Sequence, residues 1–414
     1  MCCLFRWIFK LLLLVAILFV SLVIYLSWLQ KPFYFPKPTG EYAIGSVTYH
    51  WIDTNRKETL QQVPEHPNRE IMVQIWYPAS GKPQEIPATP YTTYAQNYTW
   101  QTDKLTWLVE HSRPIYVWTM PDAKIADISQ QFPVIIFSHG FTGRFDINTA
   151  QCEELASNGY VVVGIGHTFD SILMEFPDGR IAKISDKKLG KFTHPLDLTE
   201  EEVDIRVADT QFVIDQITKL NSDQQNFLYN KLDLNKIGMF GHSLGGVTTI
   251  KIMPKDSRIK AGAVLDSPLM GKEFFQKFSQ PFMFMLQESI YDAIWVTDDP
   301  EKMDTQIKWA QERYIPGIEK FSQSLSNDVY NITIKGAKHM AFCDLALLKE
   351  AIFLSPLFNN LGVGEINGFN AVKIINSYLV AFFDKYLKNK PSDLLDGKIK
   401  PYPEVELKSW IKNK

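Results

Sequence analysis

The chain has 414 residues, of which 45% are hydrophobic and 13% aromatic. This is enough apolar material to bury a large core, and it excludes an intrinsically disordered protein. A formal net charge of −3 excludes the strongly basic surface with which proteins bind nucleic acid, so we expect no nucleic-acid partner. Zinc-binding, P-loop and complete dinucleotide-binding motifs are also missing from the sequence, and we predict no metal and no cofactor.

The first element in chain order is an uncharged apolar run, Leu11 to Leu29. As a helix it rises about 1.5 Å per residue and crosses the hydrocarbon core of a bilayer. The run is longer than the apolar region of a secretory signal peptide, and no small-residue cleavage site follows it. We therefore predict that residues 1–30 are a transmembrane signal anchor. Secretion after cleavage is the alternative.

Basic residues flank this run and bear on its orientation. Arg6 and Lys10 precede it and favour a cytoplasmic N-terminus with the bulk of the chain outside the cytoplasm, although Lys31 and Lys37 beyond it weaken the asymmetry. The next segment, residues 31–40 (KPFYFPKPTG), predicts a proline-stiffened linker. Residues 41–414 then predict a single domain, because no repeat and no internal linker interrupts them.

Two stretches with period-two alternation, GEYAIGSVTYHWIDT and REIMVQIWYPAS, predict an antiparallel strand pair at a sheet edge. From residue 132 onward, predicted strands alternate with helices. The strands are FPVIIFSHG, VVVGIGH, KIGMF, AGAVLD, PFMFML and NITIKG, and the helices are INTAQCEELASNGY, Thr199 to about Leu220, VTTIKIM and NAVKIINSYLVAFFDKYL. This alternation predicts a mainly parallel sheet with helices on both faces, whose site lies at the carboxyl ends of the strands.

The stretch KIGMFGHSLGG places Ser243 between an apolar strand and a helix, at a sharp turn. This pattern is typical of a nucleophile elbow, in which the serine backbone is strained and strand and helix approach closely. Gly241 and Gly245 fit that geometry because neither carries a Cβ atom. An ordinary glycine-rich turn is the alternative for the pentapeptide taken alone.

A serine hydroxyl needs a histidine to take its proton and a carboxylate to orient that histidine. The only histidine C-terminal to Ser243 is His339, on the loop after NITIKG, so we predict His339 as the base rather than a surface residue. The acid stays open at this point. Asp266 ends the strand AGAVLD, while Glu288 and Asp292 follow the next strand, in the more usual position for this fold.

The oxyanion formed in ester hydrolysis needs two backbone N–H donors. Leu244, directly after the nucleophile, is the predicted first donor, and Phe141 in SHGFTG is the predicted second. His139 lies outside the order serine, acid, histidine, so we assign it a structural role in this loop. A plain strand-end turn is the alternative for SHG.

With FSHGFTG, GHSLGG, AVLDSP and IKGAKHMAF in this order, together with GEYAIGS, IWYPAS and EEEVDIR, the sequence resembles the plasma-type platelet-activating factor acetylhydrolases. These are lipoprotein-associated phospholipases of α/β-hydrolase fold, and the resemblance covers roughly residues 40–390. It implies that Asp266 is the acid, that Glu288 lies outside the triad, and that the amides of Phe141 and Leu244 are the oxyanion donors. Leu244 stands where the mammalian enzymes have an aromatic residue, which leaves the shape of the acyl pocket in doubt.

The resemblance further implies calcium-independent hydrolysis of a short or oxidised sn-2 acyl ester of a glycerophospholipid, with a lipid membrane as partner. General carboxylesterase or polyester hydrolase activity on the same fold is the first alternative. An acyltransferase and an inert membrane-anchored binding protein are further ones. The aromatic segment Tyr91 to Trp118 is a candidate lid, or else an insertion packed on the domain.

Overall fold

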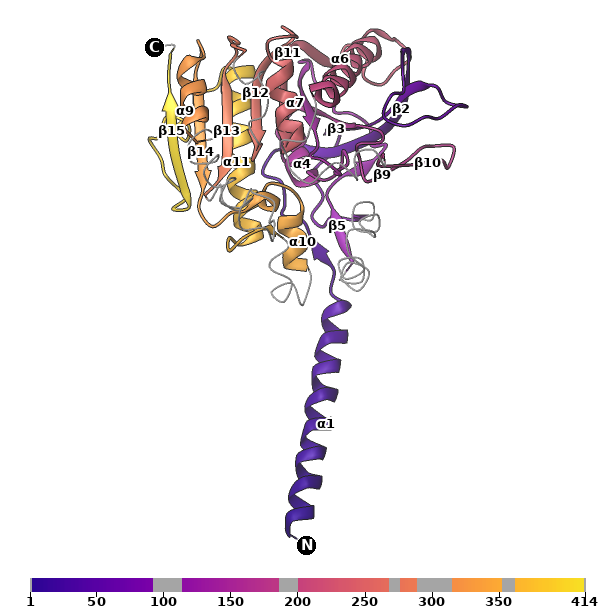
Figure 1. Ribbon diagram of the computed structural model, residues 1–414, viewed down its shortest axis with the longest axis vertical. Coiled ribbons are helices and arrows are strands. Elements are labelled where there is room, and N and C mark those ends of the chain that lie inside the picture. Colours follow the sequence, from indigo (N-terminus) through magenta and orange to yellow (C-terminus); the bar gives the residue numbers. More distant parts are fainter. Residues whose placement is uncertain are drawn as a thin grey trace.

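The computed structural model describes residues 2–91, 114–185, 200–267, 276–288, 315–351 and 362–412. Helix α1 (Cys2–Leu29) projects as a long stalk from a folded body that contains the remaining elements (Figure 1). Residues Phe5–Leu29 are long and apolar enough to cross a membrane, and none of their most apolar window is buried against the body.

A ten-stranded mixed sheet forms the centre of the body. The strands from β14 to β8 run parallel, β3 runs antiparallel to both β8 and β2, and β15 runs antiparallel to β14. In spatial order they are β15 (Val405–Trp410), β14 (Val329–Ile334), β13 (Phe282–Gln287), β12 (Ile259–Leu265), β11 (Leu232–His242), β7 (Phe132–Ser138), β8 (Val161–Gly166), β3 (Asn68–Ala79), β2 (Ala43–Lys57) and β6 (Met120–Pro121).

Two hydrophobic cores lie on the two faces of this sheet, because successive side chains of a buried strand point to opposite sides. In β7, Ile135 and Phe137 join one core, whereas Val134 and Ile136 join the other. The first core packs against α4 (Thr149–Ser157), α10 (Leu345–Ala351) and α11 (Gly368–Leu387). The second packs against α6 (Glu200–Ser222), α7 (Leu244–Ile252) and α9 (Ile315–Ser324).

Smaller elements lie at the margins of the sheet. A three-stranded sheet holds β1 (Phe33–Tyr34), β5 (Ile115–Val117) and β4 (Thr89–Pro90) in the order β1-β5-β4. A hairpin holds β9 (Leu173–Glu175) and β10 (Ile181–Lys183). The short 3₁₀ helix η5 (His339–Phe342) precedes α10.

The predicted α/β-hydrolase fold, with a mainly parallel sheet covered on both faces, is confirmed. All of the strands predicted from the sequence are present, and β2 and β3 form the expected antiparallel pair. Strand β15 was not predicted; its alternating polar residues leave it partly exposed at the sheet edge. Thr199, expected to begin the helix now seen as α6, lies outside the described residues.

Within residues 31–40, the expected linker, two side chains are buried in the body and the others are partly or fully exposed. Phe33 and Phe35 are buried in the same core as α11. The candidate lid falls mostly on residues 92–113, which lie outside the described residues. Its two described ends, Tyr91 and Trp118, are buried.

Candidate active site

Ser243 occupies the turn between β11 and α7 with φ 53° and ψ −120°. Residues with a side chain rarely adopt this backbone conformation of positive φ, which is expected of the serine in a nucleophile elbow. A Cβ atom on Gly241 would overlap the backbone of Gly245, and one on Gly245 would overlap the carbonyl of Ser138. The glycines are therefore required by the close approach of α7 to β11 and β7.

The structure brings Ser243, His339 and Asp266 together in one hydrogen-bonded chain. Ser243 Oγ lies 3.0 Å from His339 Nε2, and His339 Nδ1 lies 2.6 Å from Asp266 Oδ2. The residues come from three different loops, after β11, β14 and β12, which meet because the carboxyl ends of parallel strands share one edge. His339 is partly exposed, while Asp266 is buried.

Gln287 completes the environment of the Asp266 carboxylate. Its backbone N–H donates to Oδ1 over 3.1 Å, and its side-chain amide donates to Oδ2 over 2.8 Å. These neutral donors fix the carboxylate without neutralising its charge. Glu288, the other acid considered, accepts instead from the amide of Gly336 at 2.9 Å, and Asp292 lies outside the described residues.

His242, directly before the elbow serine, was not predicted as a site residue. Its ring lies 4.8 Å from the His339 ring, and its Nε2 lies 3.2 Å from the His339 carbonyl oxygen. Burial, followed by the proximity of His339, holds the pKa of His242 well below its ordinary value. A neutral His242 thus donates from Nε2–H to that carbonyl and supports the loop that carries His339.

The loop after β7 lies against Ser243, where the second oxyanion donor is expected. A Cβ atom on Gly140 would stand 3.1 Å from the Ser243 Cβ. Phe141 follows Gly140 and packs against the core that includes α7. Leu244 is the first residue of α7 and is buried. The two residues whose amides were predicted as donors therefore lie on the two segments that border Ser243.

Arg206, on α6, hydrogen-bonds to two carbonyl groups of this loop. It was also not predicted as a site residue. Its Nη1 donates to the His139 carbonyl over 2.6 Å and its Nη2 to the Gly140 carbonyl over 3.4 Å. Its Nε forms an ion pair with buried Asp170. In a planar trans peptide the C=O and the next N–H point in opposite directions. Drawing the Gly140 carbonyl toward Arg206 turns the Phe141 N–H away from Arg206.

His139 adds to this arrangement and has the structural role expected of it. Its Nδ1–H donates to the Gly140 carbonyl over 2.6 Å, and its Nε2 accepts from the His167 backbone N–H over 3.2 Å. Burial, together with the charge of Arg206, holds the pKa of His139 well below its ordinary value. The ring is therefore neutral, in the tautomer that both hydrogen bonds require.

A second serine–histidine–aspartate chain lies behind the same loop. Ser138 Oγ lies 2.9 Å from His167 Nε2, and His167 Nδ1 lies 2.9 Å from Asp209 Oδ2. All three are fully buried. Burial and the nearby Arg206 lower the pKa of His167 to about 4. Burial alone would raise the pKa of Asp209, but Arg69, 2.7 Å away, holds it well below its ordinary value.

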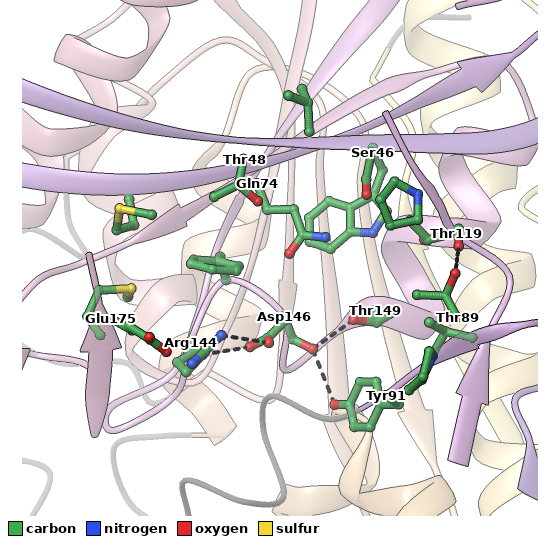
Figure 2. A pocket seen from close by; sticks show the side chains of 18 of the residues that line it. Ser46, Thr48, Gln74, Thr89, Tyr91, Thr119, Arg144, Asp146, Thr149 and Glu175 are labelled. Atoms are coloured by element: carbon green, nitrogen blue, oxygen red, sulfur yellow. Dashed lines mark hydrogen bonds and ion pairs between the residues drawn. The ribbon is translucent and has the colours of Figure 1, made fainter. Parts of the chain in front are cut away.

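Other cavities lie elsewhere in the described part of the body. A cavity of about 870 Å³ lies between β2, β3 and the loop that carries Arg144 and Asp146, and Ser243 is not among its lining residues (Figure 2). A second, of about 690 Å³, lies between α4, α11 and the segment after α11. Within the described ranges, no group of three or more His, Cys, Asp or Glu side chains is arranged to hold a metal ion.

Comparison with known proteins agrees with the geometry. The family model of platelet-activating factor acetylhydrolase, isoform II, matches residues 29–401. A platelet-activating factor acetylhydrolase of Cavia porcellus is 25% identical over 375 residues, which cover 85% of this chain and 78% of that protein. A probable 1-alkyl-2-acetylglycerophosphocholine esterase of Arthroderma benhamiae is 28% identical over 289 residues, covering 66% of this chain and 65% of that protein.

A solved structure shares the fold. A ferulic acid esterase from Streptomyces cinnamoneus superposes with a TM-score of 0.69 at 24% identity, covering 91% of this chain and 99% of the esterase. The family match extends over nearly the whole body and includes both loops that border Ser243. The chain belongs to the platelet-activating factor acetylhydrolase isoform II family and is a carboxylic ester hydrolase of α/β-hydrolase fold.

Proposed function

We propose that this protein hydrolyses short or oxidised sn-2 acyl esters of glycerophospholipids without calcium. The observation that carries the proposal is the hydrogen-bonded chain Ser243–His339–Asp266 at a strained elbow, in a member of this family. Ser243 is the proposed nucleophile, His339 the base and Asp266 the acid that orients it. The amides of Phe141 and Leu244 are the proposed oxyanion donors.

The proposed reaction follows from these contacts. Asp266 accepts the Nδ1–H of His339, which leaves Nε2 free to take the proton of the Ser243 hydroxyl. The serine oxygen attacks the ester carbonyl, and the two amides hold the negative charge that develops on the carbonyl oxygen. His339 then protonates the departing lysolipid oxygen. Water, deprotonated by His339, releases the acyl group as a carboxylate and restores Ser243.

Helix α1 extends the proposal to location. We propose that residues 1–30 remain as a membrane anchor, that residues 31–40 join it to the catalytic domain of residues 41–414, and that this domain lies outside the cytoplasm. Trp7 near one end of the apolar stretch and Tyr25 and Trp28 near the other match the aromatic belts found at both membrane surfaces. An anchored esterase meets membrane lipid at a high effective concentration.

The experiment compares 2-acetyl and 2-palmitoyl phosphatidylcholine as substrates of the full-length protein in detergent micelles with a calcium chelator. The Ser243→Ala variant is the control. We expect cleavage of the acetyl lipid, little cleavage of the palmitoyl lipid, and loss of both in the variant. If the protein hydrolyses a simple nitrophenyl ester but neither lipid, it is instead a general carboxylesterase.

A further inference from the structure

The junction between the membrane helix and the body is short and is hydrogen-bonded on both sides. The N–H of Gln30 still donates to Leu26 O over 3.3 Å and that of Lys31 to Trp28 O over 3.1 Å, which continues the helical bonding. Two residues later the N–H of Phe33 donates to Pro114 O over 2.7 Å, within the small sheet of β1. Only Pro32 separates the two bonded segments, and its ring fixes its φ angle.

Beyond the junction the chain is fixed in the body by buried aromatic groups. The Phe35 N–H donates to the Tyr116 carbonyl over 3.0 Å, and Trp118 Nε1 donates to the Phe35 carbonyl over 2.9 Å. The rings of Phe35 and Tyr91 lie 4.8 Å apart. Burying each phenylalanine ring contributes about 1.5–3 kcal/mol. Residues 33–35 are therefore a docked strand rather than a spacer.

The docked strand connects to the loop that carries His339. The Tyr91 hydroxyl donates to Asp344 Oδ2 over 3.0 Å and lies 3.3 Å from the Asp146 carbonyl, a contact visible in Figure 2. Asp344 lies directly beyond η5 and Cys343, and its carboxylate accepts the N–H of Thr149 over 2.8 Å, at the start of α4. The docked strand therefore contacts Tyr91 through Phe35, and Tyr91 contacts Asp344, which lies just beyond the short helix η5 that begins at His339.

These contacts identify the edge of the sheet from which the membrane helix emerges. Asp146 and Thr149 follow β7, and Asp344 follows β14, so all of them lie at the carboxyl edge of the parallel strands. Ser243 lies at the same edge, at the end of β11. Figure 1 shows α1 leaving the body next to β5 and α10, on this side.

We propose that the docked strand orients the domain so that its active site faces the bilayer that α1 crosses. This rests on the proposed function and deepens it: the substrates are ester lipids in the domain-side leaflet of the protein's own membrane. With the site turned toward its own bilayer, other membranes and soluble lipid particles meet the opposite edge of the body, which lacks the site. Their lipids are therefore poor substrates. A flexible tether would give proximity without this selectivity.

The test separates α1 from the docked strand without altering either. Twelve Gly/Ser residues inserted between Lys31 and Pro32 span roughly 20 Å and allow the domain to tumble. The control carries the same twelve residues after Lys414. Each protein is reconstituted into vesicles that contain 2-acetyl phosphatidylcholine, or into plain vesicles mixed with separate substrate vesicles.

Orientation is measured independently of activity by energy transfer to a dye on the lipid headgroups. A donor is attached to Lys335→Cys, at the carboxyl edge beyond β14, or to Lys260→Cys, near the start of β12 at the opposite edge. Both positions are exposed, and the native Cys152 and Cys343 are buried. Cys2 and Cys3 are replaced by serine so that only the chosen position is labelled.

We expect transfer at position 335 to exceed transfer at position 260 in the parent and in the control, and the difference to disappear in the tethered variant. The parent should cleave lipid in its own vesicle at least tenfold faster than lipid in separate vesicles, and the insertion should bring this ratio toward one. Equal transfer at both positions in the parent, or a ratio unchanged by the insertion, overturns the orientation. If the parent, the tethered variant and the control all fail to hydrolyse a soluble ester, the proposed function is overturned instead. The energy-transfer data still decide the orientation.

Discussion

The molecule contains two serine–histidine–aspartate chains with nearly the same spacing and very different surroundings. In one, Ser243 and His339 are partly exposed, the serine backbone is strained, and neutral amides of Gln287 hold Asp266. In the other, which links Ser138, His167 and Asp209, every member is buried.

The difference shows that hydrogen-bond distances alone do not identify a nucleophile. Asp209 is paired with the guanidinium groups of Arg69 and Arg56, so its charge is already compensated. The carboxylate of Asp266 bonds to Gln287 and His339, and within the described residues no arginine or lysine compensates its charge, as the proposed role beside an imidazolium requires. Ser138, the last residue of β7, is fully buried, whereas Ser243, in the turn after β11, is partly exposed. Access and uncompensated charge separate the two chains.

The largest expected effect comes from replacing the two serines in turn. Ser243→Ala should lower kcat on a soluble ester by about 10⁵-fold or more, because the proposed nucleophile is removed. Ser138→Ala should keep kcat within a few-fold while lowering the free energy of unfolding by about 1–3 kcal/mol, since His167 loses its partner. Labelling with a fluorophosphonate checks both. A comparable loss of labelling in the two folded variants would contradict the distinction.

Replacing the two aspartates tests the contrast between Asp266, whose charge the proposed reaction uses, and Asp209, whose charge is compensated by arginines. Asp266→Asn should lower kcat by about 10³–10⁴-fold with little change in Tm, because the imidazolium loses its counter-charge. Asp209→Asn should destabilise the fold by about 3–5 kcal/mol, because it removes one of the two buried carboxylates that pair with Arg69, leaving Glu58 as the other. Kinetics and thermal unfolding of both variants test this. The reverse assignment of effects would refute it.

Arg206 connects the two regions, since it binds the carbonyls that precede Phe141. Arg206→Met should lower kcat by about 10²-fold with KM nearly unchanged, because a misdirected amide weakens stabilisation of the transition state rather than substrate binding. Arg206→Lys should recover part of this loss. A change confined to KM, or to thermal stability with kcat intact, would show that Arg206 does not position the oxyanion donor.

The buried chain should also make stability depend on pH. His167 has a folded pKa of about 4, below its value of about 6.5 in an unfolded chain. Protonation therefore favours the unfolded state, and the stability present above pH 6.5 is lost as pH falls toward 4, by about 3 kcal/mol in total. Tm measured at pH 7 and pH 5 should fall in the parent and fall less in His167→Gln. An equal fall in both would assign the effect to other groups.

Local sequence patterns were sufficient for much of the fold and for the elbow. Glycine spacing around Ser243 predicted a close approach that the positions of Gly245 and Ser138 explain. The order of motifs also predicted which loops meet at the carboxyl edge. These features depend on residues near one another in the chain or on the general rules of parallel sheets.

Features that depend on distant partners were not predicted. The role of Arg206 becomes visible only when α6 packs behind the loop after β7, and that of His242 only beside His339. The same holds for Phe33 and Phe35, whose proline-rich surroundings indicated a linker. Their burial depends on β5, which follows them by about eighty residues.

The docking of β1 also has a consequence for the order of events during synthesis. Phe33 packs against the ring of Phe369, at 5.6 Å, near the start of α11. Because α1 precedes α11 in the chain, a ribosome delivers α1 well before the α11 residue on which Phe33 packs. The contact between β1 and α11 can therefore form only after α11 has been synthesised.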